Sequence, residues 1–223
     1  MKKTITAQGA IEVLQGVHYT YRGKNCNPQH ENKIKNLLCN AVARYQQPAA
    51  CLVTVWLNDS AGATISQLTD FINSQFRDNK VLDGKRLSAS GEVVPVYRSR
   101  GKPLFVYVRE VKDKKAGDCF SDSGEHVHLA FCWDAKYSMR YGFIPMVFQA
   151  AIAKGIIKAP DEFCKFPAFL SGNHNLLTRE GLENASKHLV RYCAKTQTKV
   201  KSGKPNIGGT RLQKIYTKEL NNV

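Results

Sequence analysis

The chain has 223 residues, of which 43% are hydrophobic, and this is enough to bury one substantial core. Its 33 Lys and Arg outnumber its 18 Asp and Glu, and the resulting formal charge of +15 favours a polyanionic partner. The seven cysteines form no C-x-x-C pair, which argues against a thiolate zinc cluster. No stretch is apolar enough to span a membrane, which argues against a membrane protein. No G-x-x-x-x-G-K-[ST] motif occurs, which argues against a nucleotide-driven motor. The polar start MKKTITAQGA lacks a secretion signal, so we expect a cytoplasmic protein with reduced thiols.

The first half of the chain alternates between helix and strand patterns. Apolar residues recur at three- and four-residue steps over 34–42, which predicts an amphipathic helix that ends near Pro48. Residues 51–57 are apolar and rich in β-branched side chains, as in a buried strand. Thr64 can cap a helix with one apolar face. Residues 80–102 are rich in Gly, Ser, Lys and Arg and predict a loop or a weak hairpin.

The second half contains two further strand patterns and two further helix patterns. Residues 104–111 and 126–133 predict strands, and the polar connection between them indicates a hairpin with a long loop. Pro145 suits the first turn of a helix that stops at Gly155, and a last helix is predicted over about 178–196. With the strand of the first half, the pattern supports three strands.

Two histidines separated by one apolar residue are the sharpest local feature. Side chains alternate between the faces of a strand, so His126 and His128 share one face while Val127 points to the other. Two imidazoles at this spacing can bind one metal ion, although ordinary strand histidines are the alternative. A hard ion such as Mg²⁺ or Mn²⁺ favours a carboxylate as third ligand, and Glu110 near the end of the neighbouring predicted strand offers one. Glu125 is the other candidate, but in a regular strand it points away from His126.

The second feature is a Tyr-x-x-Lys motif, Tyr192 and Lys195, one turn apart on the predicted last helix. His188 and Lys199 extend the same helix face. A phenol is almost fully protonated at neutral pH, so it attacks only where a cation, metal or base favours the phenolate. Lys195 could do this, or could neutralise charge that builds on a phosphate. A second Tyr-x-x-Lys begins at Tyr21 without a predicted helix, and a packed surface tyrosine is the alternative for either motif.

Positive charge concentrates in two segments. Residues 185–218 carry nine Lys or Arg and no acidic residue, which predicts a basic C-terminal arm. The segment 80–102 adds a second group that can lie along a phosphate backbone, and binding through such contacts should weaken steeply as salt rises. The candidate residues for binding such a backbone, which would be DNA-binding residues if the partner is DNA, are Arg98, Arg100 and Lys102 in the second group and Arg191, Lys199, Lys201 and Lys204 in the arm.

The order of these motifs resembles a known superfamily. A His-x-His strand followed by a helical Tyr-x-x-Lys in a basic chain is similar to the HUH endonucleases, which include rolling-circle replication initiators, relaxases and single-strand transposases. The segment 104–133 resembles the metal-binding hairpin of viral initiators, and 186–199 most resembles the replication proteins of filamentous phages (inoviruses) and their prophage relatives. The resemblance covers roughly residues 34–200.

The resemblance implies a role for each motif. His126, His128 and Glu110 would hold Mn²⁺ or Mg²⁺, while Tyr192 would attack the DNA and Lys195 would assist it. The implied activity is site-specific nicking and joining of single-stranded DNA or an origin hairpin, through a 5′-phosphotyrosine, to start rolling-circle replication. One helical tyrosine follows the His pair, as in the single-tyrosine class. The fused helicase of the family is absent, which implies a separate host helicase in a bacterial cytoplasm.

The resemblance also implies the fold, an α+β domain with a central antiparallel sheet of about five strands, of the ferredoxin or RNA-recognition-motif type, and packed helices. The two strands that the pattern does not supply are expected between 81 and 98 and around 163–170, and Pro95 restricts the first to a sheet edge. The expected divisions are an N-terminal extension at 1–33, the endonuclease domain at 34–200 and a basic C-terminal tail at 201–223.

Three other functions fit some of these features. A transposase or relaxase would use the same site on different DNA. A non-catalytic DNA-binding regulator would explain the charge and leave Tyr192 without a chemical role. A structural zinc module would combine the two histidines with Cys119 or Cys132, and removal of its zinc would unfold the chain.

Overall fold

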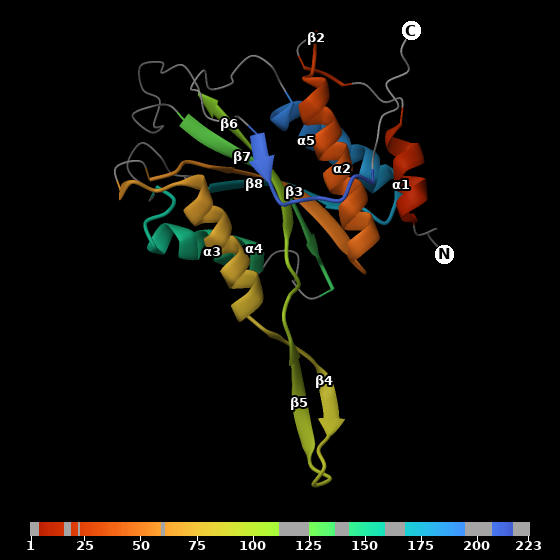
Figure 1. Cartoon of the computed structure of the whole chain (residues 1–223), viewed down its shortest axis with the longest axis vertical. Coiled ribbons are helices and arrows are strands. Elements are labelled where there is room, and N and C mark those ends of the chain that lie inside the picture. Colours follow the sequence, from red (N-terminus) through yellow and green to blue (C-terminus); the bar gives the residue numbers. More distant parts are fainter. Residues whose placement is uncertain are drawn as a thin grey trace.

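The computed structural model describes residues 5–15, 19–21, 23–58, 61–111, 125–136, 143–158, 168–194 and 207–215. Within these residues, the centre is a five-stranded antiparallel sheet with the strand order β8-β3-β7-β6-β9 (Figure 1). Its strands are β3 (Pro48–Val55), β6 (Leu104–Val111), β7 (Glu125–Asp134), β8 (Ala168–Asn175) and β9 (Ile207–Gly209). The expected α+β class, with about five antiparallel strands and packed helices, is confirmed.

Helices cover both faces of this sheet (Figure 1). On one face α2 and α5 pack against the strands, and α1 packs against both helices. On the other face lie α3 and α4. The helices are α1 (Ala7–Leu14), α2 (Pro28–Arg44), α3 (Ile65–Asp78), α4 (Phe143–Ala153) and α5 (Arg179–Cys193). The two sides are called the α2/α5 face and the α3/α4 face below.

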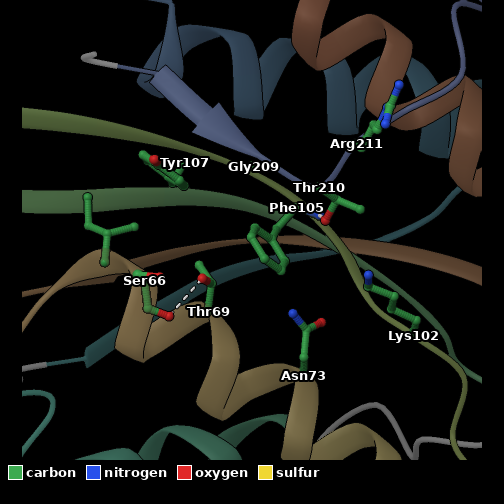
Figure 2. A pocket seen from close by; sticks show the side chains of 10 residues that line it. Ser66, Thr69, Asn73, Lys102, Phe105, Tyr107, Gly209, Thr210 and Arg211 are labelled. Atoms are coloured by element: carbon green, nitrogen blue, oxygen red, sulfur yellow. Dashed lines mark hydrogen bonds between the residues drawn. The ribbon is translucent and has the colours of Figure 1, made fainter. Parts of the chain in front are cut away.

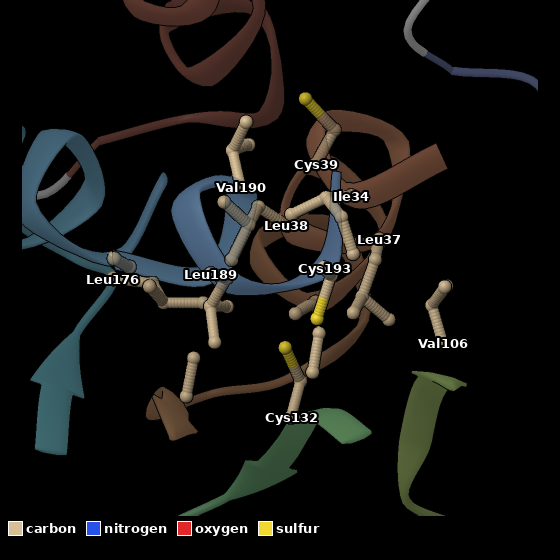
Figure 3. Close-up of a cluster of buried hydrophobic side chains, with 14 of the residues drawn as sticks. Ile34, Leu37, Leu38, Cys39, Val106, Cys132, Leu176, Leu189, Val190 and Cys193 are labelled. Carbon is tan, nitrogen blue, oxygen red and sulfur yellow. The ribbon is translucent and has the colours of Figure 1, made fainter. Parts of the chain in front are cut away.

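The alternation of side chains along each strand divides the core between the two faces. Val106 and Cys132 lie in the cluster under α2 and α5, which Figure 3 shows together with Leu189 of α5. Phe105 and Phe131, their neighbours in sequence, lie in the cluster under α3 and α4. β3, β6 and β7 therefore each contribute to two separate cores, and the position of a residue along these strands determines which face its side chain occupies.

The helices begin where the sequence supplies capping side chains. The Asn27 side chain accepts hydrogen bonds from the first turn of α2, and Pro28 follows as the first helical residue. Thr64 and Gln67 form a reciprocal capping box at α3. Thr178 caps α5 in the same way as Asn27 caps α2. These caps explain why the predicted helices at 34–42, after Thr64 and near 178 are confirmed.

Residues 81–98 do not join the sheet. They form β4 (Val81–Leu87) and β5 (Val93–Arg98), a separate antiparallel hairpin that projects from the body of the molecule (Figure 1). The expectation that this segment supplies a sheet strand is wrong, whereas the hairpin predicted within 80–102 is confirmed. The register shifts at Gly84, which has a φ of 151°, and Pro95 lacks an N–H, so neither strand offers the regular ladder that a sheet strand needs.

The sheet gains β8 and, in place of the misplaced strand, β9. β8 begins at residue 168, which falls within the stretch around 163–170 where a strand was expected, and 159–167 lie outside the described residues. β9 pairs with β6 and was not predicted, because a three-residue strand with two glycines has no periodic pattern. Gly209 has a φ of 146°, and a Cβ there would collide with the Phe105 carbonyl, so this close pairing requires glycine.

A third ladder lies near the N-terminus, where β1 (Thr20–Tyr21) pairs with β2 (Lys24–Asn25). Packing continues across the expected domain limits, because Ala10 and Leu14 of α1 are fully buried and β9 belongs to the sheet. The division into 1–33, 34–200 and 201–223 stays a prediction, because the packing of the described residues shows no boundary at these limits. None of the helices in the described ranges combines the length and the apolarity that crossing a membrane would require.

Candidate metal centre

Two adjacent strands bring a glutamate and two histidines together. β6 and β7 pair with Glu110 opposite His126 and Val108 opposite His128, so the predicted hairpin is confirmed. Residues that are opposite in a ladder share a face, as do alternate residues along one strand. Glu110, His126 and His128 therefore all lie on the α2/α5 face. The side chain of Glu125, the other candidate ligand, lies outside the described part of the structure.

The three side chains converge on one point. The Nε2 atoms of His126 and His128 are 3.2 Å apart, and they lie 3.8 and 3.3 Å from Oε2 of Glu110. The exposed fractions are 0% for Glu110, 8% for His126 and 5% for His128. Two imidazole nitrogens and a carboxylate oxygen form a donor set that suits divalent ions, and one donor atom from each residue lies within 4.8 Å of the others. The cluster could therefore hold a metal ion.

Thr54 and Trp56 orient the two histidines. Thr54 lies opposite His128 in the ladder between β3 and β7, and its Oγ1 is 2.7 Å from Nδ1 of His128. For Nε2 to offer a lone pair to a metal, the ring proton must be on Nδ1, where it donates to Thr54. The Trp56 ring stacks on the His126 ring, with centroids 5.8 Å apart. Sequence reasoning missed both residues, because it predicted the strand at 51–57 but not which strand it pairs with.

Tyr192 lies beside this cluster. The buried residues Leu189, Val190 and Cys193 hold α5 against α2 and the sheet, and Tyr192 is half-buried at the edge of that packed surface. Its ring centroid lies 5.9 Å from that of His128. The structure thus brings the predicted nucleophile to the predicted metal ligands. Lys195 lies outside the described residues, and its role stays a prediction.

A second polar cluster forms where β8 bulges. His174 lies opposite Ala50 while Ser171 lies opposite Leu52, so β8 has one residue more than β3 in this stretch. The extra residue puts Ser171 and His174 on the same face, toward α5. There Nε2 of His188 is 2.8 Å from Oγ of Ser171, and Nδ1 of His188 is 3.0 Å from Nε2 of His174.

His188 connects the second cluster to Tyr192. Their rings meet edge to face, with centroids 5.4 Å apart at 88°. Burial, followed by the charges of His174 and Arg191, lowers the pKa of His188 to about 4, so this imidazole is neutral at pH 7. Gly172 in the bulge has a φ of 72°, and a Cβ there would meet both imidazole rings. The sequence placed His188 on the Tyr192 side of the helix, but its partners on β8 were missed because a bulge breaks the period of two.

The predicted DNA-binding residues have different surroundings. Arg98 on β5, Lys102 before β6 and Arg191 on α5 are exposed. Arg100 instead packs its guanidinium over the Phe143 ring, 4.0 Å from the centroid, and burial lowers its pKa. Arg100 is thus less available to a phosphate than the sequence suggested. The remaining candidates, Lys199, Lys201 and Lys204, lie outside the described residues.

The structural zinc module fits less well. Cys132 is buried on the α2/α5 face, four residues after His128, but it is not part of the metal-ligating group found within the described residues. Burial, with a smaller contribution from Cys51, raises the pKa of the Cys132 thiol well above its usual value, which disfavours the thiolate that zinc requires. Cys119 lies outside the described residues.

The site thus combines metal donors, an orienting hydroxyl and a tyrosine on one face of the sheet. Comparisons with protein-family models, with curated proteins and with solved structures find no match to this chain. The function is therefore inferred from the chemistry that these residues allow.

Proposed function

We propose that this protein is a metal-dependent enzyme that nicks and rejoins single-stranded DNA at a replication origin. The observation that carries the proposal is the position of Tyr192, whose ring lies 5.9 Å from that of the candidate ligand His128. A tyrosine whose ring lies so close to a candidate ligand can bring its hydroxyl to a phosphate that the metal also binds. The proximity of Tyr192 to His128 favours nucleophilic attack on a phosphodiester over a purely structural role for either side chain.

The proposed reaction begins with attack of the Tyr192 hydroxyl oxygen on phosphorus. A bond between phosphorus and the tyrosine oxygen forms as the bond between phosphorus and the 3′ oxygen breaks. The tyrosine hydroxyl gives up its proton, and the departing 3′ oxygen takes one up, so the step is balanced overall. The products are a free 3′ hydroxyl and a 5′-phosphotyrosine. Reversal of the same step rejoins a strand without ATP, which agrees with the absence of a nucleotide-binding motif from the sequence.

Each residue of the site has a separate task. Mn²⁺ or Mg²⁺, the ions that the oxygen donor Glu110 suits, would offset the negative charge that builds on the phosphate. Thr54 keeps His128 in the tautomer that can act as a ligand. His188 packs its neutral ring at right angles to that of Tyr192 and so limits the rotation of Tyr192. Lys195, three residues after Tyr192 in sequence, would favour the phenolate.

The burial of the cluster favours an enzyme over a DNA-binding regulator. A carboxylate that is fully excluded from water loses its hydration, and Glu110 lies in this state beside two imidazoles. A module that only binds DNA needs surface cations, which the chain has in excess, but it does not need these three residues in one place. The excess of 15 positive charges would bind the strand, and separation of the duplex would come from another protein such as a host helicase.

The proposal is tested by looking for a covalent adduct between the protein and DNA. Purified protein is incubated with a diverse pool of labelled single-stranded DNA, with Mn²⁺ or with EDTA, and tryptic peptides are examined by mass spectrometry. We expect an adduct on Tyr192 that requires the metal and is lost in Tyr192→Phe. Tyr21→Phe is the matched control, because Tyr21 begins the other Tyr-x-x-Lys sequence and should not be needed.

Tight, salt-sensitive binding to the DNA pool without cleavage or an adduct would overturn the proposed enzymatic activity and favour a non-catalytic DNA-binding regulator. An adduct on Tyr192 with transfer only between ends of a mobile element or transfer origin would instead identify a transposase or relaxase with the same chemistry.

A further inference from the structure

A cavity of about 350 Å³ lies between α3 and the β6–β9 edge of the sheet (Figure 2). Phe105 and Tyr107 of β6 line it, and both side chains belong to the α3/α4 face. Glu110 of the same strand belongs to the opposite face, because it is an odd number of residues away from both. The cavity is therefore separate from the metal centre.

The walls of the cavity combine three kinds of group. Lys102 and Arg211 are exposed cations, and no acidic residue is found among the described residues that line it. The half-buried ring of Tyr107 supplies an aromatic wall. Asn73 of α3 supplies an amide. Two cations, an aromatic ring and an amide match the parts of a nucleotide, and the volume lies in the range of small-molecule sites.

Asn73 gives the cavity an unused hydrogen-bond acceptor. Its side chain points from α3 toward Phe105 (Figure 2). Its Oδ1 atom is buried and has no hydrogen-bond partner in the part of the chain that the structure describes. A buried acceptor without a donor is unfavourable, so a ligand that donates an N–H here would gain more than a similar ligand without one. Nucleobases carry such N–H groups on their edges.

The residues of β9 and the residue after it are held against β6 in a way that leaves room for the ring of Tyr107. Thr210 donates its backbone N–H to the Phe105 carbonyl, and its hydroxyl oxygen accepts from the Phe105 N–H. A Cβ at Gly208 would collide with the Tyr107 hydroxyl and ring. The absence of a side chain at Gly208 thus lets Tyr107 keep its place in the wall of the cavity.

We propose that this cavity binds one nucleotide of a single-stranded nucleic acid. The phosphate lies at Lys102 and Arg211, and the base lies against Tyr107 with an N–H donated to Asn73. The choice of a strand over a free nucleotide rests on the proposed function and on the excess of positive charge. Because the cavity and the metal centre are on opposite faces of the sheet, the bound nucleotide is not the one that carries the scissile phosphate.

Photochemical cross-linking tests this assignment. The full-length protein in EDTA is irradiated with a short single-stranded DNA that carries 5-iodouracil, or with the free mononucleotide of 5-iodouracil, and the labelled peptides are mapped. We expect the strand to label Tyr107. Arg211→Glu, which reverses an exposed charge without disturbing the core, should lower the yield at Tyr107 at least fivefold. Asn73→Leu should also lower it, whereas Lys85→Glu, the same reversal of an exposed charge on the distant hairpin, should not.

Labelling of other peptides with none at Tyr107 would overturn the inference, as would equal yields in Arg211→Glu and the unaltered protein. Labelling by the mononucleotide alone would overturn the assignment to a strand. EDTA blocks the proposed nicking, so the two proposals can fail separately. If Tyr107 is labelled but the protein does not cleave DNA with Mn²⁺, the nucleotide-binding cavity is supported and the nicking activity is rejected. If the protein cleaves DNA but Tyr107 is not labelled, the nicking activity is supported and the nucleotide-binding cavity is rejected.

Discussion

The two faces of the central sheet are made by the same strands but have different contents. The α3/α4 face is aromatic around Phe131, whose ring centroid lies between 5.9 and 6.4 Å from those of Phe76, Phe105, Trp133 and Phe148. Such a core excludes water and fixes the strands relative to one another.

The α2/α5 face is apolar over most of its length but buries polar groups at one end. There Thr54 joins Glu110, His126 and His128, and Tyr192 lies against the last of these. The difference suggests a division of labour, in which the aromatic face stabilises the strands and the polar end of the other face performs the chemistry. Each prediction below changes a residue on one face and measures the property that the residue is assigned.

The largest effect is expected from Phe131→Ala. It removes a fully buried ring from among four others, so the free energy of unfolding should fall by about 3–5 kcal/mol. Mn²⁺ affinity of the folded protein should change little, because Phe131 points away from the metal centre. Urea unfolding and calorimetric titration measure the two quantities. If the free energy of unfolding fell by less than about 1 kcal/mol, the aromatic α3/α4 face would not be the main source of stability for the strands.

His128→Ala should have the converse effect. Loss of one of three candidate ligands should weaken Mn²⁺ binding at least about 100-fold, beyond what loss of an outer partner causes. His174→Ala is the matched control, since it removes an imidazole on the same face outside the cluster. Equal Mn²⁺ affinities for the two variants, measured by calorimetric titration, would be incompatible with a metal centre at this position.

Thr54→Val should have a smaller effect at the same centre. The variant keeps the shape of the side chain but cannot accept the proton on Nδ1 of His128, and metal affinity should fall about 10- to 100-fold. The metal titration used for His128→Ala also measures this change. An unchanged affinity would mean that Thr54 does not select the tautomer of His128.

The smallest effect concerns the pH dependence of stability. The pKa of His188 is about 4 in the folded protein and near 6.5 ordinarily, so the unfolded chain binds its proton more tightly. As pH falls from about 6.5 to about 4, this group should lower the free energy of unfolding, and above pH 6.5 it should have no further effect. His188→Gln should show a shallower decline in urea unfolding over that range. If the free energy of unfolding declined equally with falling pH in the two proteins, the lowered pKa of His188 would be refuted.

The regular parts of the molecule could be predicted from the sequence. The His-x-His pair lies on a strand without a bulge, so the period of two placed both histidines on one face, and the predicted hairpin put the strand that carries Glu110 beside them. The capped helix at Thr178 similarly fixed the helix face of Tyr192. These predictions needed only local patterns.

The missed features depend on contacts between distant segments. Thr54 became a partner of His128 through the pairing of β3 with β7, which no local pattern specifies. Ser171 and His174 share a face only because β8 bulges at Gly172. The segment 81–98 was assigned to the sheet because the resemblance implies about five strands, whereas its apolar residues Leu82, Leu87, Val93 and Tyr97 remain exposed.

The most direct test asks whether the metal centre and Tyr192 form one site. The protein is labelled with 3-fluorotyrosine, its ¹⁹F NMR signals are assigned with Tyr192→Phe and Tyr97→Phe, and Mn²⁺ is added in small steps. Because the Tyr192 ring is 5.9 Å from that of His128, its signal should broaden beyond detection first, while that of exposed Tyr97 on the projecting hairpin should persist. Equal broadening of the two signals, or none, would show that the paramagnetic ion does not bind beside Tyr192 and would contradict a shared catalytic site.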